Sequence, residues 1–383
     1  MNTDLIDRIL NRGTEEIIDQ KHLEETLRSG KKLRVKLGID PTAPDIHLGH
    51  SVVLRKLKQF QELGHTVVLI IGDFTARIGD PSGRNEARKP LTAEEIEKNL
   101  KGYLEEAGKI IDVKKSEIRR NSEWHAKGGL EHILSIAQSA TVQQILRRDD
   151  FKKRLAEDSD ISLLETLYPI LQGYDSVAVK ADVELGGTDQ KFNLLMGRRV
   201  QRHFGMNEQD ILTVPLIEGT DGVKKMSKSY GNYIGLSETP ENMFGKTMAI
   251  PDALIKKYFT LLTDNDIPDI TNPYEAKMLL AETITGMYHS KKDAEKAREN
   301  FIKKFSKKET PDDAPALKVG KKETTLLDLL LKSGVESKSE ARRLITQHAI
   351  QLNETVKKDP DEIISVRGGE ILKVGKRKFF KLV

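Results

Sequence analysis

Near its N-terminus the chain carries a strand that is apolar at every position. Residues 67–71 read Val-Val-Leu-Ile-Ile and are followed by Gly72. A strand-like segment at 33–39 precedes them, and a helix at about 47–63, closed by Gly64, separates the two. A strand with no polar face must be covered on both sides, as in a parallel sheet flanked by helices. The chain therefore opens with a strand–helix–strand unit of an α/β fold.

The strand–helix alternation is interrupted and then resumes. Residues 1–30 predict two short helices, and about 90–180 predict a largely helical insertion. Strand patterns return at 182–184 and 211–217, helices follow Ser237, and the polar stretch 306–315 predicts a linker. We expect a doubly wound, Rossmann-like catalytic domain at 1–235 with the insertion at about 90–180. A helical domain at 236–310 and a small α+β domain at 321–383 complete the expected organisation.

Composition excludes several classes of protein. A chain of 383 residues suits two or three domains. It contains no cysteine, so it has neither a disulfide framework nor a thiolate metal site. Its longest apolar run is far shorter than the ~20 residues that span a bilayer, and its first residues lack a signal-peptide pattern. The sequence therefore predicts a cytoplasmic protein that does not enter the membrane.

Positive charge is concentrated at the C-terminal end. Residues 321–383 hold 14 Lys and Arg and 9 Asp and Glu, a balance of +5. The first 320 residues hold the remaining 49 and 50, a balance of −1. A near-neutral body with a basic terminal module favours a polyanionic partner, although charge alone does not distinguish this from an ordinary basic surface.

Two motifs point to phosphate chemistry. His47, Gly49 and His50 lie at the expected start of the helix that follows the first strand, where free backbone N–H groups favour anions. Lys225 and Lys228 lie in a loop between Gly222 and Gly231, suited to neutralising charge on a pyrophosphate. Either motif alone is weak evidence, because each also fits an ordinary surface turn.

Their order along the chain is more specific. One motif follows the first strand and the other follows the last, and the pair resembles the two ATP-binding signatures of class I aminoacyl-tRNA synthetases. A third segment, Gly186-Gly187-Thr188-Asp189-Gln190, resembles the tyrosyl and tryptophanyl members, in which the Asp holds the ATP ribose and the Gln contacts the amino acid. The resemblance implies catalytic roles for His47, His50, Lys225 and Lys228. It implies ATP contacts for Asp40, Gly49, Gly187, Asp189, Met226 and Ser227.

Three polar residues on one helix face indicate which amino acid is the expected substrate. Tyr168, Gln172 and Asp175 are spaced i, i+4 and i+7, so they share one face of a helix. This pattern resembles the tyrosyl-tRNA synthetases, in which the Tyr and Gln hold the substrate's amino group and the Asp accepts its phenolic hydroxyl. The same resemblance implies tyrosine contacts for Thr75, Asp80 and Gln190, and pyrophosphate contacts for Arg84 and Arg88.

One position departs from the family pattern. Lys36 stands where the best-studied branch has a tyrosine that gives the substrate hydroxyl a second hydrogen bond. Either Lys36 reaches that hydroxyl, or it points elsewhere and leaves the hydroxyl to Asp175. The sequence leaves both readings open.

The C-terminal module resembles the S4 RNA-binding fold. Ser337 and Glu340 form a capping-box pattern at the start of a helix with one basic and one apolar face. Lys338, Arg342 and Arg343 on the basic face are the expected phosphate contacts. Glu354, after Asn353, replaces the turn glycine that is usual in this fold.

The resemblances together imply an enzyme that activates tyrosine with ATP and transfers it to tRNA(Tyr). They also imply Mg²⁺ arriving with ATP, no tightly bound cofactor, no protein metal site and a homodimer joined through the insertion. A tryptophanyl-tRNA synthetase is the nearest alternative, disfavoured by the Tyr168–Gln172–Asp175 face and the basic tail. A nucleotidyltransferase and an RNA-binding protein with a degenerate nucleotide fold are the others, disfavoured by the intact lysine loop.

Overall fold

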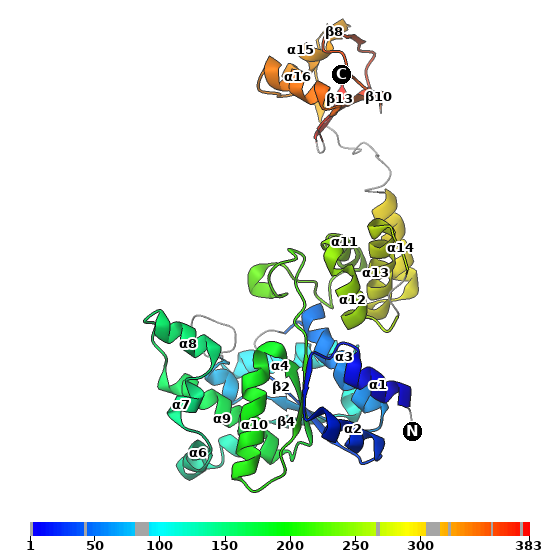
Figure 1. The fold of residues 1–383 in the computed structure, drawn as a ribbon. Helices are drawn as coiled ribbons and strands as arrows, with labels where there is room; N and C mark the ends of the chain where they lie inside the picture. The colour runs from blue at the N-terminus through cyan, green and yellow to red at the C-terminus, as the bar shows by residue number, and fades with distance from the viewer. Residues whose placement is uncertain are drawn as a thin grey trace. The chain divides into compact units, whose positions relative to one another are not determined.

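The chain forms two compact units, Met1–Arg298 and Glu299–Val383. A computed structural model describes residues 3–41, 44–80, 92–265, 269–303, 315–320, 323–353, 355–375 and 378–383. Figure 1 shows the fold of the chain, and each unit buries its own hydrophobic core.

The first unit is built on a six-stranded sheet with the order β1-β6-β5-β2-β3-β4. Its strands are β1 (Glu16–Ile18), β2 (Arg34–Ile39), β3 (Thr66–Ile71), β4 (Glu117–Arg120), β5 (Val183–Gly187) and β6 (Asp210–Val214). All neighbouring strands pair in parallel except β1, which runs antiparallel to β6 at one edge. The doubly wound α/β fold expected from the sequence is confirmed.

The order of the strands reverses at β2. From β2 the chain passes to β3 and β4 on one side, and it later returns to β5 and β6 on the other. In open α/β sheets a crevice forms at such a reversal, outside the carboxyl ends of the strands. Here the strand ends on either side of the reversal are Ile39 of β2 and Gly187 of β5.

Helices cover the sheet and form the insertion. They are α1 (Thr3–Asn11), α2 (Gln20–Arg28), α3 (Leu48–Glu62), α4 (Ala93–Ala107), α5 (Ser122–His125), α6 (Gly129–Ala137), α7 (Val142–Ile145), α8 (Asp149–Ala156), α9 (Leu163–Ala178) and α10 (Lys191–His203). Capping boxes fix the starts of α4, at Thr92 and Glu95, and of α9, at Ser162 and Glu165. The expected insertion is mostly helical, but it also contains β4, which joins the main sheet.

Short 3₁₀ turns link several of these elements. They are η1 (Thr75–Arg77), η2 (Val113–Lys115), η3 (Thr188–Gln190), η4 (Lys228–Tyr230) and η5 (Asp252–Leu254). Two of them, η3 and η4, carry residues of the ATP motifs.

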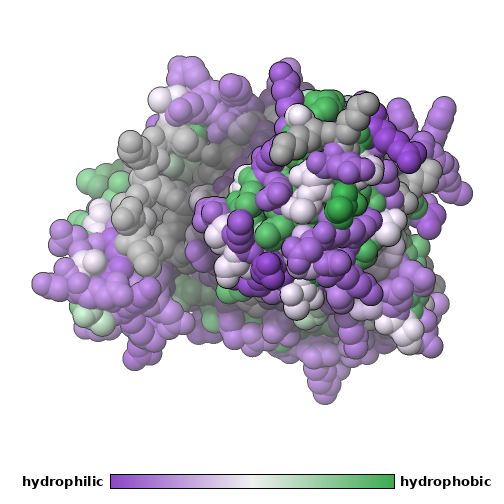
Figure 2. All heavy atoms as spheres, turned by 90° about the horizontal axis from the view of Figure 1, so that it is seen from above, coloured by the Kyte–Doolittle hydropathy of each residue, from purple (hydrophilic) through white to green (hydrophobic). Residues whose placement is uncertain are grey.

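Four more helices follow the sheet: α11 (Pro240–Met248), α12 (Ile255–Leu262), α13 (Pro273–Tyr288) and α14 (Lys291–Phe301). Both α11 and α12 pack against α13, as Figure 1 shows. Within the described ranges, no helix is long and apolar enough to cross a membrane. Hydrophilic residues cover most of the face seen in Figure 2, with small hydrophobic patches between them.

The second unit combines two helices with short strands. Its elements are β7 (Ala316–Leu317), β8 (Glu323–Thr325), α15 (Leu326–Lys332), α16 (Lys338–Thr346), β9 (Ile350–Leu352), β10 (Thr355–Val356), β11 (Ile363–Ser365), β12 (Ile371–Val374) and β13 (Lys378–Leu382). The larger sheet has the order β10-β9-β12-β13-β7, and β11 pairs with β8. The side chain of Ser337 accepts a hydrogen bond from the Glu340 N–H, so α16 begins where the sequence predicts.

Candidate active site

The start of α3 presents the two motif histidines at the carboxyl edge of the sheet. His47 caps the helix, and its Nδ1 accepts the Gly49 N–H at 3.2 Å. His50 Nδ1 accepts the His47 N–H at 3.2 Å, and the two rings lie 3.9 Å apart. Because both Nδ1 atoms accept, the proton of each neutral ring resides on Nε2. A Cβ at position 49 would lie 2.9 Å from the His47 ring, so this turn requires glycine.

Both histidines are neutral at physiological pH. Burial lowers the pKa of His47 to about 2, with contributions from His50 and Lys228. Burial and Lys228 lower the pKa of His50 to about 4. Each ring therefore offers an Nε2–H donor without adding a positive charge.

The lysine loop lies beside these histidines. Leu48 N–H donates to the Ile234 carbonyl at 2.9 Å, and Leu236 N–H donates to the Ile46 carbonyl at 3.1 Å. The segment that follows the loop is thereby hydrogen-bonded to the start of α3. The two motifs, which lie almost 180 residues apart in the sequence, meet at one edge of the sheet.

Each motif lysine is held by a carboxylate. Lys225 Nζ lies 2.7 Å from Asp189 Oδ2, and Lys228 Nζ lies 2.7 Å from Asp45 Oδ2. Met226 is buried beneath the loop, and its N–H donates to the Ile217 carbonyl. The two ammonium groups of the loop are thus each paired with a carboxylate from another part of the first unit.

Asn232 braces the loop internally. Its Oδ1 accepts the Ser227 N–H at 2.8 Å, and its Nδ2 donates to the Lys224 and Lys225 carbonyls. The side chain of Ser227 in turn caps η4 by accepting the Ser229 N–H. These bonds define the backbone shape from which the two lysines extend.

Helix α4 of the insertion supports the approach to His47. Glu106 is buried, accepts the Ile46 N–H and accepts the hydroxyl of Ser237. Asn99 Nδ2 donates to the Pro41 carbonyl at 2.9 Å. One helix therefore fixes the loop before the histidines and the segment after the lysines.

Tyr168 is one of the residues of α9 that are predicted to contact the amino acid, and it is hydrogen-bonded to the residue that follows β2. Tyr168 donates its hydroxyl to Asp40 Oδ2 at 2.9 Å, and Thr75 donates to Asp40 Oδ1 at 3.1 Å. Burial raises the pKa of Tyr168 well above its usual value, and the charges of Asp40, Asp80 and Asp175 add to this effect. Asp40, expected to contact ATP, is thus bonded to two residues expected to contact the amino acid.

Asp175 is buried in a ring of hydrogen-bond donors. Trp124 Nε1 donates to Oδ1 at 2.9 Å, and His125 Nε2 lies 3.2 Å from the same oxygen. Asn121 Nδ2 lies 3.4 Å from Oδ2 and donates to Thr75 at 2.9 Å. A carboxylate has about four acceptor positions, so Oδ2 retains capacity for another donor.

Lys36 is directed away from Asp175. Its Nζ lies 2.8 Å from Glu184 Oε1 on the neighbouring strand β5, and both side chains are fully buried. Gln172 Nε2 donates to the same Glu184 oxygen at 2.7 Å. Of the two readings left open by the sequence, the structure favours the one in which Lys36 points elsewhere.

Asp80 and Gln190 lie beside the α9 face. Asp80 Oδ1 is 3.4 Å from Asn193 Nδ2 and 3.9 Å from the Arg148 guanidinium. Gln190 Oε1 accepts the Gly187 N–H at 3.0 Å at the end of β5. A Cβ on Gly187 would lie 2.8 Å from Asp189, so glycine keeps this carboxylate in place.

The remaining predicted residues are Arg84, Arg88 and the basic residues of α16. Arg84 and Arg88 fall outside the described residues. Lys338, Arg342 and Arg343 are exposed on α16 of the second unit, and Ile345 on the other face is buried in its core. The basic and apolar faces predicted for this helix are confirmed.

Sequence reasoning missed several partners in the site: Asp45, Glu106, Asn121, Trp124, His125, Arg148, Glu184 and Asn193. A usable signal existed for the segment from Asn121 to His125. It directly follows β4, at the same carboxyl edge as the other site loops, and it contains the chain's single tryptophan. Because β4 was not recognised in the sequence, these residues had no place in the expected site.

Comparisons with known proteins agree with this geometry. Residues 28–306 match the family model described as tRNA synthetases class I (W and Y). Residues 307–382 match the model described as Tyrosine--tRNA ligase SYY-like C-terminal domain. Together the two matches span almost the whole chain.

Two similar relatives are bacterial. The tyrosine–tRNA ligase of Thermotoga maritima is 49% identical, covering 98% of this chain and 96% of the relative. That of Aquifex aeolicus is 48% identical, covering 98% of each. Full-length similarity at this level carries the family from the relatives to this chain.

Solved structures show the same fold. A C-terminally truncated mitochondrial tyrosyl-tRNA synthetase from Aspergillus nidulans matches with a TM-score of 0.66, 21% identity, and coverage of 79% of this chain and 94% of that one. A tyrosyl-tRNA synthetase from Archaeoglobus fulgidus, complexed with L-tyrosine, matches with a TM-score of 0.61, 21% identity, and coverage of 77% and 99%. The family models, the full-length relatives and the shared fold agree, and the chain belongs to the tyrosine–tRNA ligases, class I synthetases that use ATP to join tyrosine to tRNA.

Proposed function

We propose that the edge between β2 and β5 is where this enzyme forms tyrosyl-adenylate. The observation that carries the proposal is the meeting of two motifs there: the start of α3 is hydrogen-bonded to the segment that follows the lysine loop. A helix start with two neutral imidazole donors and two ammonium groups suits a nucleoside triphosphate. ATP phosphates would replace Asp189 and Asp45 as partners of Lys225 and Lys228.

The reaction needs no side-chain nucleophile. The tyrosine carboxylate attacks the α-phosphorus of ATP, the bond to the β-phosphate oxygen breaks, and pyrophosphate leaves. A ribose hydroxyl at the 3′ end of tRNA then attacks the acyl carbon, and AMP leaves. His47, His50, Lys225 and Lys228 stabilise the negative charge that grows on the phosphates, and positioning supplies the rest.

The residues proposed to contact ATP and tyrosine are those that the sequence motifs indicate. Asp40, Gly49, Gly187, Asp189, Met226 and Ser227 form the proposed ATP surface, together with Arg84 and Arg88. Thr75, Asp80, Tyr168, Gln172, Asp175 and Gln190 form the proposed tyrosine pocket. Mg²⁺ is proposed to enter bound to ATP, as part of the substrate.

Labelled pyrophosphate exchange into ATP tests this assignment. With each of the twenty amino acids supplied in turn, we expect exchange with tyrosine. His50→Ala and Lys228→Ala should slow it about tenfold or more while tyrosine binding changes little, because both groups meet charge that develops in the transition state. Lys224→Ala, an exposed lysine of the same loop, is the matched control. Wild-type exchange in both His50→Ala and Lys228→Ala would refute the assignment.

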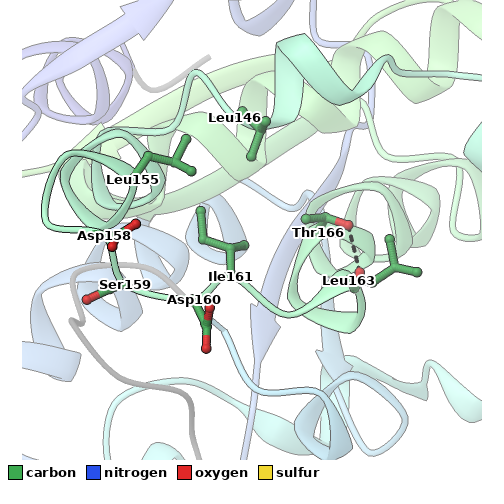
Figure 3. Close-up of a pocket in the computed structure, with 8 residues that line it drawn as sticks. All are labelled: Leu146, Leu155, Asp158, Ser159, Asp160, Ile161, Leu163 and Thr166. Atoms are coloured by element: carbon green, nitrogen blue, oxygen red, sulfur yellow. Dashed lines mark hydrogen bonds between the residues drawn. The ribbon is translucent and has the colours of Figure 1, made fainter.

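We also propose that two copies associate through the insertion. Large apolar side chains are exposed along it: Leu130, Leu134, Val142, Leu155, Leu163 and Leu164. Leu155 and Leu163 border a cavity of about 400 Å³ between α8 and the start of α9 (Figure 3). Large apolar side chains exposed along one segment favour association, and a second copy of the chain is the occupant that closed symmetry favours.

The division of labour along the chain is proposed as residues 1–235 for adenylation, 236–310 for a helical domain and 321–383 for RNA binding. The exposed basic face of α16 supports the last assignment. A ligase of this family acts where tRNA is charged, and we therefore propose a cytoplasmic location.

A further inference from the structure

A buried ion pair lies in the centre of the sheet, next to the proposed tyrosine pocket. Lys36 of β2 and Glu184 of β5 are direct neighbours in the parallel register, and neither side chain is exposed. Desolvating two charges costs several kcal/mol per ion, and apolar pairs often replace buried ion pairs without loss of stability. Stability alone therefore does not account for this ion pair.

The ammonium of Lys36 is fully occupied. It lies 2.8 Å from Glu184 Oε1, 2.9 Å from Ser176 Oγ and 3.2 Å from the Gln172 carbonyl. Two of these contacts are hydrogen bonds that the ammonium donates, and the contact with Glu184 is an ion pair. Lys36 is thus a fixed part of the sheet interior, and its ammonium is paired with the Glu184 carboxylate.

That carboxylate dictates how the Gln172 side chain is oriented. An ionised carboxylate only accepts hydrogen bonds, so the group that Gln172 turns toward Glu184 must be its NH₂, at 2.7 Å. The Gln172 Oε1 then faces the other way. It is buried and, within the described part of the chain, has no hydrogen-bond partner.

A buried acceptor without a partner destabilises the free protein, and a suitable ligand donor removes that cost. Gln172 lies on α9 between Tyr168 and Asp175, in the row proposed to contact tyrosine. An ammonium group carries only donors, so it complements an acceptor-only oxygen. If the Gln172 amide were reversed, its NH₂ would repel the same group.

We infer that Lys36 and Glu184 are positioning residues that lock the Gln172 amide with its oxygen toward the substrate's amino group. The inference rests on the proposed role of Gln172. The pair acts on amino-group recognition and not on the hydroxyl, so it does not set the preference for tyrosine over phenylalanine.

The test compares tyrosine with desaminotyrosine, which lacks only the amino group. The double variant Lys36→Met/Glu184→Leu removes the pair without leaving a lone buried charge. We expect its Kd for tyrosine, measured by calorimetry, to rise at least tenfold and its Kd for desaminotyrosine to change less than threefold. The preference for tyrosine over phenylalanine in pyrophosphate exchange should be retained. Equal weakening of both ligands, or no weakening of tyrosine, would overturn the inference.

A matched control and a second variant complete the design. Arg34→Met/Glu117→Leu makes the same exchange on an ion pair that also starts from β2, and it should bind both ligands as the wild type does. Should the first variant fail to fold, Lys36→Met/Glu184→Gln is the alternative. Its new amide side chain can present either an oxygen or an NH₂ to Gln172, so the Gln172 amide is no longer held in one orientation. It should show an intermediate amino-group preference, and an unchanged preference would refute the inference.

Gln172→Ala separates this inference from the proposed function. If Gln172→Ala leaves the amino-group preference intact, the proposed role of Gln172 fails. If Gln172→Ala removes that preference and the double variants do not, only the role of the ion pair fails.

Discussion

Asp175 is held by more donors than the recognition of one hydroxyl requires. Trp124, His125 and Asn121 surround its carboxylate, and His132 Nε2 lies 3.3 Å from the other ring nitrogen of His125. The aromatic ring of Tyr174 packs against both histidines. These contacts fix the orientation of the carboxylate, and its remaining acceptor position is where we propose that the substrate hydroxyl binds.

Replacing Asp175 with alanine should therefore reduce selectivity. A buried hydrogen bond to a charged group contributes about 1.5–3 kcal/mol, and about 1.4 kcal/mol corresponds to tenfold. We expect Asp175→Ala to weaken tyrosine activation and to narrow the preference over phenylalanine at least tenfold. Gln172→Ala should weaken both amino acids to similar extents. The measurement is kcat/KM in pyrophosphate exchange, and full discrimination by Asp175→Ala would place hydroxyl recognition elsewhere in the pocket.

The histidines of α3 give a prediction about pH. Their pKa values of about 4 and about 2 lie below the ordinary value near 6.5, because burial disfavours the charged ring. The folded state binds fewer protons than the unfolded state in this window, so stability falls as pH drops from 6.5 toward 4. The ring signals of His50, identified by their loss in His50→Gln, should keep neutral-form NMR shifts from pH 8 to pH 5. A titration midpoint between 6 and 7 would contradict the buried, neutral arrangement.

At the scale of elements, the central strands were predictable and the edge strands were not. Segments 33–39, 66–71, 182–184 and 211–217 were expected as strands, and they became β2, β3, β5 and β6. These four have neighbours on both sides, and most of their buried side chains are apolar. The missed strands, β1 and β4, lie at the two edges. The sequence of β4 is Glu-Ile-Arg-Arg. One side of an edge strand lies next to solvent, so such a strand tolerates charged residues.

The candidate site likewise contains residues that the sequence predicts and residues that it does not predict. His47, His50, Lys225 and Lys228 were identifiable because their spacing and order along the chain form a motif. The residues that support them have no such pattern: Glu106 comes from the last turn of α4, and Asp45 from a loop. Such partners depend on how elements pack, which a single sequence does not display.

At the scale of the whole molecule, the two units differ in charge and in core. The second unit has a separate hydrophobic core, and the last 63 residues carry a balance of +5 against −1 for the rest. Its basic side chains are exposed on α16, where they are free to approach a phosphate backbone. Electrostatic contacts of this kind supply affinity with little dependence on base sequence.

This separation predicts independent effects on the two half-reactions. Lys338→Ala/Arg342→Ala/Arg343→Ala should raise the KM for tRNA and reduce its salt dependence, because fewer counterions are released. Pyrophosphate exchange should stay at the wild-type rate. Lys21→Ala/Lys31→Ala/Lys32→Ala removes the same charge from the first unit and should charge tRNA normally. If the α16 variant charges tRNA with an unchanged KM at moderate salt, this face is not the anchor.

The position of β4 has a consequence for where substitutions can alter the surroundings of Asp175. The donors around Asp175 come from the short segment after this edge strand, whereas the residues proposed to contact ATP come from the loops after β2, β5 and β6. An edge strand has a neighbour on one side only, so this segment enters the site from one margin of the sheet. Substitutions after β4 therefore alter the surroundings of Asp175 without changing any residue proposed to contact ATP.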